Sequence, residues 1–225
     1  MGSISVVRKP PHAKTFGVEL ECYPSGDSYA IYDIIRKRWH GFWEATEDAS
    51  IYGGVEFVSQ PMPYNMMVKQ INWLNKKFPW TVTGNCGLHI HVSRHYWPTE
   101  REKKFSKFLY TVGTAGRTRM WFGRSSGYAD VFADRTAKFR AINVLHPHTY
   151  EFRVWKAGDL AWTLEALRRT RAIVEYRGEY TVEWMDKLCG VQPLVKTFND
   201  SAGINTPPAV RRARRVIHPA GSGGF

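Results

Sequence analysis

The chain has 225 residues, of which 43% are hydrophobic, and it contains nine tryptophans, eleven tyrosines and twelve phenylalanines. This composition can build a substantial core, so it excludes a largely disordered chain. No apolar run approaches the roughly 18 residues that cross a membrane, and the first residues lack the apolar stretch of a secretory signal. We therefore expect a cytoplasmic protein with no membrane partner.

Basic residues dominate the charge, with 32 lysines and arginines against 20 acidic residues, a formal net charge of +12. Such a field attracts polyanions such as nucleotides, nucleic acids or acidic proteins. The last segment is rich in proline, glycine and arginine and has no periodicity. We expect an N-terminal arm (1–14), one folded domain (15–190) and a basic, flexible tail (191–225), with an acidic protein or nucleic acid as a candidate partner of the basic surface and tail.

The three cysteines, Cys22, Cys86 and Cys189, are odd in number and far apart. No C-x-x-C pair indicates a zinc ribbon or a redox site. Reduced, partly buried thiols in a reducing compartment are the favoured interpretation. Cys86 precedes a glycine, but no Cys–His–Asn order supports a nucleophile there.

Strands are predicted wherever apolar and polar residues alternate between turn signals. The segments with this pattern are 15–23, 42–47, 53–60, 80–94, 138–145 and 149–156. The fourth segment contains a Gly-Asn turn, and the last two form a hairpin around His146-Pro147-His148.

Four helices are predicted between these strands, because apolar residues recur there at helical spacing. Asp27 or Ser28 caps a first helix that runs to residue 39, and residues 67–78 carry the apolar stripe of the second. Thr99 with Glu102 forms a capping box that opens the third helix, through residue 112. Asp159 caps a last helix that continues to about residue 187.

Strands thus outnumber helices, and the helices come between hairpins. This order predicts an α+β domain with a mostly antiparallel sheet lined by helices on one side. A Rossmann or P-loop domain is disfavoured, because neither G-x-G-x-x-G nor G-x-x-x-x-G-K-[ST] is present.

Four of the predicted strands carry ionisable residues, and residues two apart share one face of a strand. They are Glu19 and Glu21, Glu56, His89 and His91, and Glu151 and Arg153. Alternating charges on a solvated sheet face are common, but these residues are flanked by apolar ones. Glycine precedes three of the motifs, where it allows a close approach to the backbone.

If these side chains converge, electrostatics requires a cation among them. Two carboxylates about 4 Å apart repel by roughly 4 kcal/mol at an effective dielectric near 20. A cluster of that kind either binds protons or holds metal ions. Mostly oxygen ligands with an occasional imidazole suit Mg²⁺ or Mn²⁺ better than zinc, and a pair of such ions clamps nucleotide phosphates.

The order of the motifs resembles the amidoligase family, within the glutamine synthetase and glutamate–cysteine ligase superfamily of carboxylate–amine ligases. The motifs are F-G-V-E-L-E at 16–21, G-V-E-F-V-S-Q-P at 54–61, G-L-H-I-H-V at 87–92 and Y-E-F-R at 150–153. The resemblance implies a glutamine-synthetase-like catalytic domain that uses ATP with Mg²⁺ or Mn²⁺. It implies an enzyme that forms an amide or isopeptide bond between a carboxylate and an amine through an acyl phosphate.

By the same resemblance, Glu21 and Glu56 share one ion of a metal pair, with Glu47 or Asp48 as the third ligand. The other ion of the metal pair takes Glu19, His89 and Glu151, so two further strands contribute ligands.

The remaining site residues surround the nucleotide by resemblance. His91 lies beside the phosphates, and Arg153 neutralises the transferring phosphoryl group. Arg135 and Arg140 contact phosphate and acyl phosphate. The chain is much shorter than a glutamine synthetase. We therefore expect it to lack the small N-terminal domain of that enzyme and the site between subunits that goes with it. The loops that recognise the acceptor in that enzyme cannot be assigned to residues of this chain.

Two other functions stay open at this point. One is a zinc-dependent hydrolase or cupin-like metalloenzyme that uses His89 and His91, for which tight stoichiometric zinc would be diagnostic. The other is a basic nucleic-acid or assembly-binding protein without catalysis, supported by the net charge and by the arginines at 211–215.

Overall fold

The structure is a computed structural model. It describes residues 14–48, 51–124, 130–131 and 140–191. The chain divides into two units, residues 1–193 and 194–225, and all described residues belong to the first. Nearly all of the expected N-terminal arm and C-terminal tail, together with Arg135, therefore lie outside the described residues.

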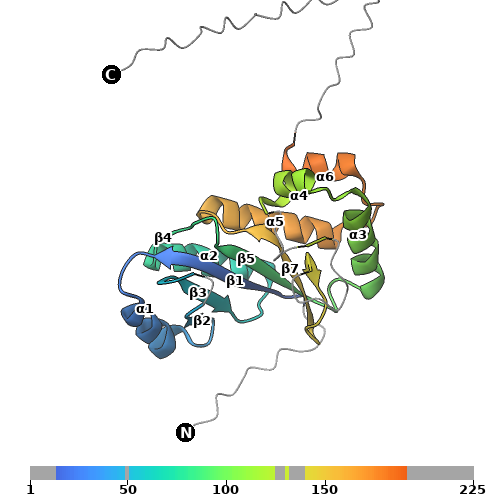
Figure 1. The fold of residues 1–225 in the computed structure, drawn as a ribbon. Helices are drawn as coiled ribbons and strands as arrows, with labels where there is room; N and C mark the ends of the chain where they lie inside the picture. Colours follow the sequence, from blue (N-terminus) through green and yellow to red (C-terminus); the bar gives the residue numbers. More distant parts are fainter. Residues whose placement is uncertain (1–13, 49–50, 125–129, 132–139, 192–225) are drawn as a thin grey trace, which may run out of the picture. The chain divides into compact units, whose positions relative to one another are not determined.

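Seven strands of the described part form one open sheet, with the spatial order β2-β3-β1-β5-β7-β6 and with β4 paired to β1 (Figure 1). Every pairing between these strands is antiparallel. The strands are β1 (Phe16–Pro24), β2 (Trp43–Thr46), β3 (Val55–Ser59), β4 (Trp80–Thr81), β5 (Gly87–Ser93), β6 (Ile142–Asn143) and β7 (Thr149–Lys156).

Six α-helices accompany the sheet within the described residues, so the predicted α+β class with a mostly antiparallel sheet is confirmed. They are α1 (Ser28–Ile34), which continues into a π-helical turn (Ile35–Trp39), α2 (Tyr64–Lys77), α3 (Thr99–Val112), α4 (Ala115–Phe122), α5 (Leu160–Glu175) and α6 (Val182–Cys189).

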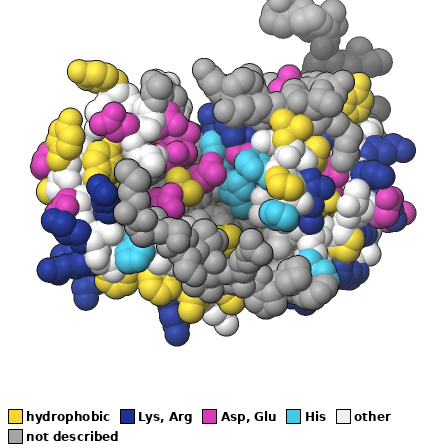
Figure 2. Space-filling view, turned by 90° about the horizontal axis from the view of Figure 1, so that it is seen from below, with side chains coloured by type: hydrophobic (Ala, Val, Ile, Leu, Met, Phe, Trp, Pro, Cys, Tyr) yellow, Lys and Arg dark blue, Asp and Glu magenta, His cyan; other side chains and the backbone are white. Residues whose placement is uncertain are grey.

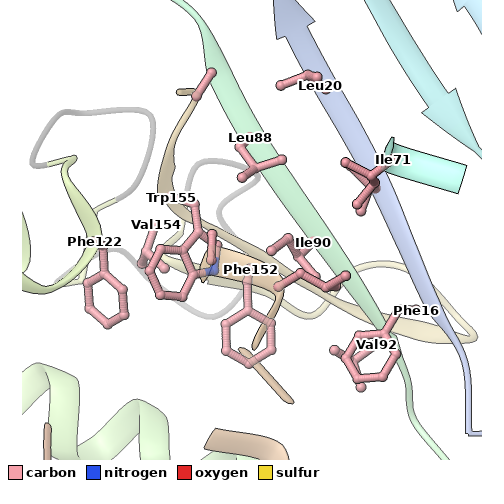
Figure 3. Close-up of a cluster of buried hydrophobic side chains, with 14 of the residues drawn as sticks. Phe16, Leu20, Ile71, Leu88, Ile90, Val92, Phe122, Phe152, Val154 and Trp155 are labelled. Atoms are coloured by element: carbon pink, nitrogen blue, oxygen red, sulfur yellow. The ribbon is translucent and has the colours of Figure 1, made fainter. Parts of the chain in front are cut away.

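One face of the central strands forms the core. The apolar residues of β1 and β5 are almost fully buried, and α2 and α5 pack against these strands (Figures 1 and 3). These residues are Phe16, Val18, Leu20, Leu88, Ile90 and Val92. Each buried side chain of this size contributes about 1.5–3 kcal/mol, so a slip of one residue, which would expose the whole set, is strongly disfavoured. The apolar face therefore fixes the register of the polar residues on the opposite face.

The predicted strand over 80–94 is two separate strands that do not pair with each other. β4 pairs with the end of β1, where Tyr23 lies opposite Thr81, whereas β5 pairs along the middle of β1. Alternation in a sequence reports an extended segment but not its partner, so the Gly-Asn turn joins two neighbours of β1.

The predicted capping box at the start of α3 is wrong. Pro98 occupies the N-cap position, and Thr99 is already helical. The Thr99 hydroxyl instead shares a hydrogen bond with the Tyr150 hydroxyl at 2.8 Å. Glu102 is buried and accepts a hydrogen bond from Ser106 Oγ at 2.6 Å, so it faces the core.

The predicted helix over 159–187 is two helices. Asp159 caps α5 as expected, but α5 ends at Glu175. The Arg101 guanidinium donates hydrogen bonds to the carbonyl oxygens of Tyr176 and Gly178, beyond the helix end, and Thr181 then caps α6. A side chain from α3 thus stabilises a turn that the local sequence alone does not predict.

Candidate functional site

The strand register brings the motif residues face to face. Glu19 lies opposite His89 and Glu21 opposite Glu56, while His91 pairs with the first residue of the Glu151-Phe152-Arg153 segment. Their side chains leave the sheet on the face away from the core, because they alternate with buried apolar residues. Figure 2 shows acidic and histidine side chains gathered around a hollow on one face of the molecule.

Glu19 lies between the two histidines of β5. Its Oε2 is 3.1 Å from His89 Nδ1, and its Oε1 is 2.9 Å from His91 Nε2. Burial alone would raise the pKa of Glu19, but hydrogen bonds to both histidines and their charges outweigh burial and hold the pKa well below its usual value. Glu19 is therefore a carboxylate at neutral pH.

His89 offers a buried nitrogen to this site. The residue is 3% exposed, and its Nδ1 faces Glu19 and, at 3.4 Å, Glu151 Oε1. Its other nitrogen, Nε2, has no hydrogen-bond partner in the part of the chain that the structure describes. A buried polar atom without a partner is costly, and a neutral imidazole nitrogen is a common metal ligand, so a bound ion would satisfy this atom.

Three carboxylates meet at the β1–β3 end of the site. Ligand atoms of Glu21, Asp48 and Glu56 all lie within 4.8 Å of one another. Glu21 Oε2 accepts a hydrogen bond from Gly87 N at 2.6 Å. The structure thus brings Asp48 into this group, whereas Glu47 is exposed.

The pKa of Glu56 reflects the repulsion between the carboxylates of this group. Burial, followed by the charges of Glu19, Asp48 and Glu21, raises the pKa of Glu56 to about 7. A cation among these oxygens would remove the repulsion and favour the ionised carboxyl group.

Two further groups both contain Glu19, and one of them shares Glu56 with the acidic group. Glu19 combines with Glu56 and His89 in one, and with His91 and Glu151 in the other, again within 4.8 Å. The five expected metal ligands therefore all occur in these groups, although the expected set of Glu19, His89 and Glu151 is divided between two of them. His91, expected beside the phosphates, lies as close to Glu19 as His89 does. The oxygen-rich donor set fits Mg²⁺ or Mn²⁺.

Glu151 is almost fully buried and lies among four potential donors. Its Oε2 accepts a hydrogen bond from Asn143 Nδ2 at 2.7 Å and lies 3.1 Å from His146 Nε2. Its Oε1 accepts from Arg153 Nη1 and faces His89. Sequence reasoning missed Asn143 and His146. The only signal was the hairpin itself, whose turn places both beside β7.

A β-bulge aims Arg153 into the site. Leu88 pairs with Trp155 and Ile90 with Phe152, so two residues of β7 stand opposite the single His89. Bulges of this kind re-aim side chains and are frequent beside active sites. Arg153 is 9% exposed and pairs with its own strand neighbour Glu151.

The other predicted phosphate ligands are Arg135, Arg140 and His91. Arg140 is buried, and its backbone forms an isolated β-bridge with Asp130 next to β6. Arg135 lies outside the described residues. His91 Nδ1 is 3.3 Å from Thr149 Oγ1. A Cβ on Gly17, opposite His91, would lie 3.3 Å from the Cβ of that histidine, so this glycine leaves room for the ring.

Comparisons with known proteins add no relatives, since neither a scan against known protein families nor a search of curated protein sequences returned a match. The motifs and their geometry are therefore what indicates the function of this chain. Cys22, Cys86 and Cys189 are buried free thiols, as predicted. No helix in the described part of the chain is long and apolar enough to span a membrane.

Proposed function

We propose that this chain is an ATP- and divalent-metal-dependent carboxylate–amine ligase with a glutamine-synthetase-like catalytic domain. One observation carries the proposal: residues from four motifs far apart in the sequence meet on one face as three overlapping groups of metal-ligand atoms. The motif order, the antiparallel sheet and this convergence agree with one another.

The side chains fit a metal pair better than they fit an ordinary sheet surface. Glu21, Asp48 and Glu56 would hold one ion, and Glu19, His89 and Glu151 would hold the other. Bound ions would supply charge neutralisation at nucleotide phosphates. The raised pKa of Glu56 agrees with an ion at the first of these positions, because a cation there would remove the repulsion between the carboxylates.

The proposed reaction has two steps. A carboxylate oxygen of the first substrate attacks the γ-phosphorus of ATP, and the bond from that phosphorus to the bridging oxygen of ADP breaks. The nitrogen of an amine then attacks the carbonyl carbon of the acyl phosphate, the carbon–oxygen bond to phosphate breaks, and the nitrogen loses a proton. The products are an amide, ADP and inorganic phosphate.

This chain's own residues would position and neutralise the reacting groups, which is most of what phosphoryl transfer requires of a protein. The Arg153 guanidinium is planar and is held by Glu151, so its remaining N–H groups can grip two phosphoryl oxygens. Asn143 and His146 hold the other oxygen of Glu151. The pair Glu151 and Arg153 is therefore fixed before substrate binds.

Hydroxylamine trapping tests the proposal, because hydroxylamine intercepts acyl phosphates as hydroxamates. The purified chain would be incubated with Mg²⁺, ATP, hydroxylamine and pools of amino acids, peptides or other carboxylates. We expect carboxylate-dependent hydroxamate and ADP in equal amounts, lost in Glu21→Gln and retained in Glu100→Gln, whose side chain is 78% exposed on α3. ATP consumption without any hydroxamate, across all pools, would contradict a ligase.

A zinc enzyme built on His89 and His91 has less support. Within the described residues, no group of three ligand atoms contains both histidines, because each faces a different oxygen of Glu19. The sheet is open and flanked by helices, unlike a cupin barrel. A binding role for the basic tail remains a separate expectation, since the arginines at 211–215 lie outside the described residues.

A further inference from the structure

The first residue of β5 leaves a space in the site, and a side chain from outside the sheet reaches that space. A Cβ built on Gly87 would lie 2.6 Å from Arg124 Nη1, 3.1 Å from His89 Nε2 and 3.2 Å from Glu21 Oε2. The guanidinium of Arg124 therefore shares the space above Gly87 with one nitrogen and one oxygen of the proposed metal ligands. No motif or periodicity in the sequence distinguishes Arg124 from the other arginines.

The fold anchors Arg124 in this place. Gly123 ends α4 in a left-handed conformation, with φ of 77°, and forms a bridge with Trp155 of β7. A Cβ on Gly123 would lie 3.3 Å from the Trp162 ring, so a larger residue fits poorly there. Phe122 packs edge-on against Trp155, with ring centroids 4.9 Å apart (Figure 3). The segment is thus tied to the strand that carries Glu151.

A guanidinium beside metal ligands needs an explanation, because it repels any cation that those ligands hold. The repulsion becomes attraction when an anion lies between the two positive charges. Phosphate oxygens suit that position, since a divalent ion and a guanidinium can each bind a different oxygen of one phosphate group. Arg153 enters the same site from β7, so two arginines would flank the phosphate from two directions.

We propose that Arg124 is a phosphate-binding residue of this site, and that Gly87 leaves the space into which its guanidinium reaches. The inference rests on the proposed function only in taking the phosphate to be that of ATP. The metal-dependent binding of a simple phosphate tests it independently of any nucleotide.

The experiment measures binding of pyrophosphate and of ATP by calorimetry, each with and without Mn²⁺, to the full chain and its variants. Arg124→Gln removes the guanidinium, and Gly87→Ala displaces it. Two controls match them. Arg119→Gln changes an exposed arginine of α4, the helix that ends just before Arg124, and Gly84→Ala adds a Cβ that would have nothing within 4 Å.

We expect Arg124→Gln and Gly87→Ala to weaken Mn²⁺-dependent binding of both phosphates by about tenfold or more. The Mn²⁺ affinity of Arg124→Gln should be equal to or higher than that of the parent, because a competing positive charge has gone. Both control variants should behave as the parent does. Free guanidinium ion should partly restore phosphate binding to Arg124→Ala, which a purely structural role does not predict.

The possible outcomes of this experiment have different consequences for the inference and for the proposed function. Parental phosphate affinity in Arg124→Gln overturns the inference and leaves the proposed ligase intact. Arg124-dependent pyrophosphate binding without any ATP binding sustains the inference and removes the proposed function. A parent that binds neither phosphate with Mn²⁺ overturns both. If Gly87→Ala fails to fold, Arg124→Gln decides alone.

Discussion

Glu19 and His89 stand directly opposite each other on the neighbouring strands β1 and β5, with Glu19 Oε2 3.1 Å from His89 Nδ1. The contact follows from the register of two strands whose other faces are buried against helices. Core packing and site geometry are therefore coupled, since a strand slip that separated these two side chains would also expose the core.

The stability of the metal-free protein should depend on pH through Glu56. Its pKa is raised to about 7 in the folded chain, so between about pH 4.5 and 7 the folded state binds more protons than the unfolded state. Stability then falls as pH rises through this window. After allowance for solvent screening, the loss is on the order of 1–2 kcal/mol.

Urea unfolding in EDTA at pH 5 and pH 8 measures this term for the parent and for Glu56→Gln. The variant should lose on the order of 1–2 kcal/mol less stability than the parent across the range. An identical pH dependence in the two proteins would show that Glu56 ionises normally and that the carboxylates are not crowded.

Glu151→Gln should separate the charge of this residue from its shape. The variant keeps the size of the side chain but removes the negative charge among Asn143, His146 and Arg153. We expect Mn²⁺ affinity to fall by about 10–100-fold, activity to fall with it, and excess Mn²⁺ to restore part of the activity. Manganese binding and phosphate release would be measured beside Glu100→Gln. Unchanged metal affinity would remove Glu151 from the ligand set.

Arg153→Lys keeps a positive charge but loses the planar fork. Metal binding should persist, while transition-state stabilisation should fall by roughly 2–4 kcal/mol, by analogy with the loss of one oxyanion donor. The comparison is between kcat of phosphate release and Mn²⁺ affinity in the same preparation. Near-parental turnover would mean that Arg153 is a structural partner of Glu151 and no more.

Arg169 provides the structural counterpart, because it is as buried as Arg153 but lies away from the site. Its guanidinium donates to Glu165 Oε1 at 2.7 Å and to the carbonyl oxygens of Trp121 and Cys189. Arg169→Gln should lower the free energy of unfolding by about 2–4 kcal/mol, since these partners lose their donor. Urea unfolding measures the loss. A change below about 0.5 kcal/mol would contradict this role.

Much of the fold could be predicted from the sequence, because burial of one face produces the helical period of about 3.6 residues and the strand period of two. The stripe Met67, Ile71, Leu74 and Phe78 is buried as the helical spacing predicted. The two-residue spacing of Glu19 and Glu21 placed both on one face of a strand, and the structure has them there.

The parts of the site that the sequence did not predict depend on contacts between distant segments. The bulge that aims Arg153 arises from pairing between β5 and β7, which neither strand's sequence specifies. Asn143 and His146 reach Glu151 only through the hairpin. Arg124, which follows α4, enters through the space that Gly87 leaves at the start of β5. Such residues carry no periodic signal of their own.

The most direct test of the central claim is the thermal stability of the purified chain with Mn²⁺, with ATP, and with both together. If the acidic and histidine side chains form a metal-dependent nucleotide site, both ligands together should raise Tm by more than the sum of their separate effects. Glu21→Gln should lose this excess and Glu100→Gln should keep it. Strictly additive shifts in the parent, or an excess that survives in Glu21→Gln, would contradict the account.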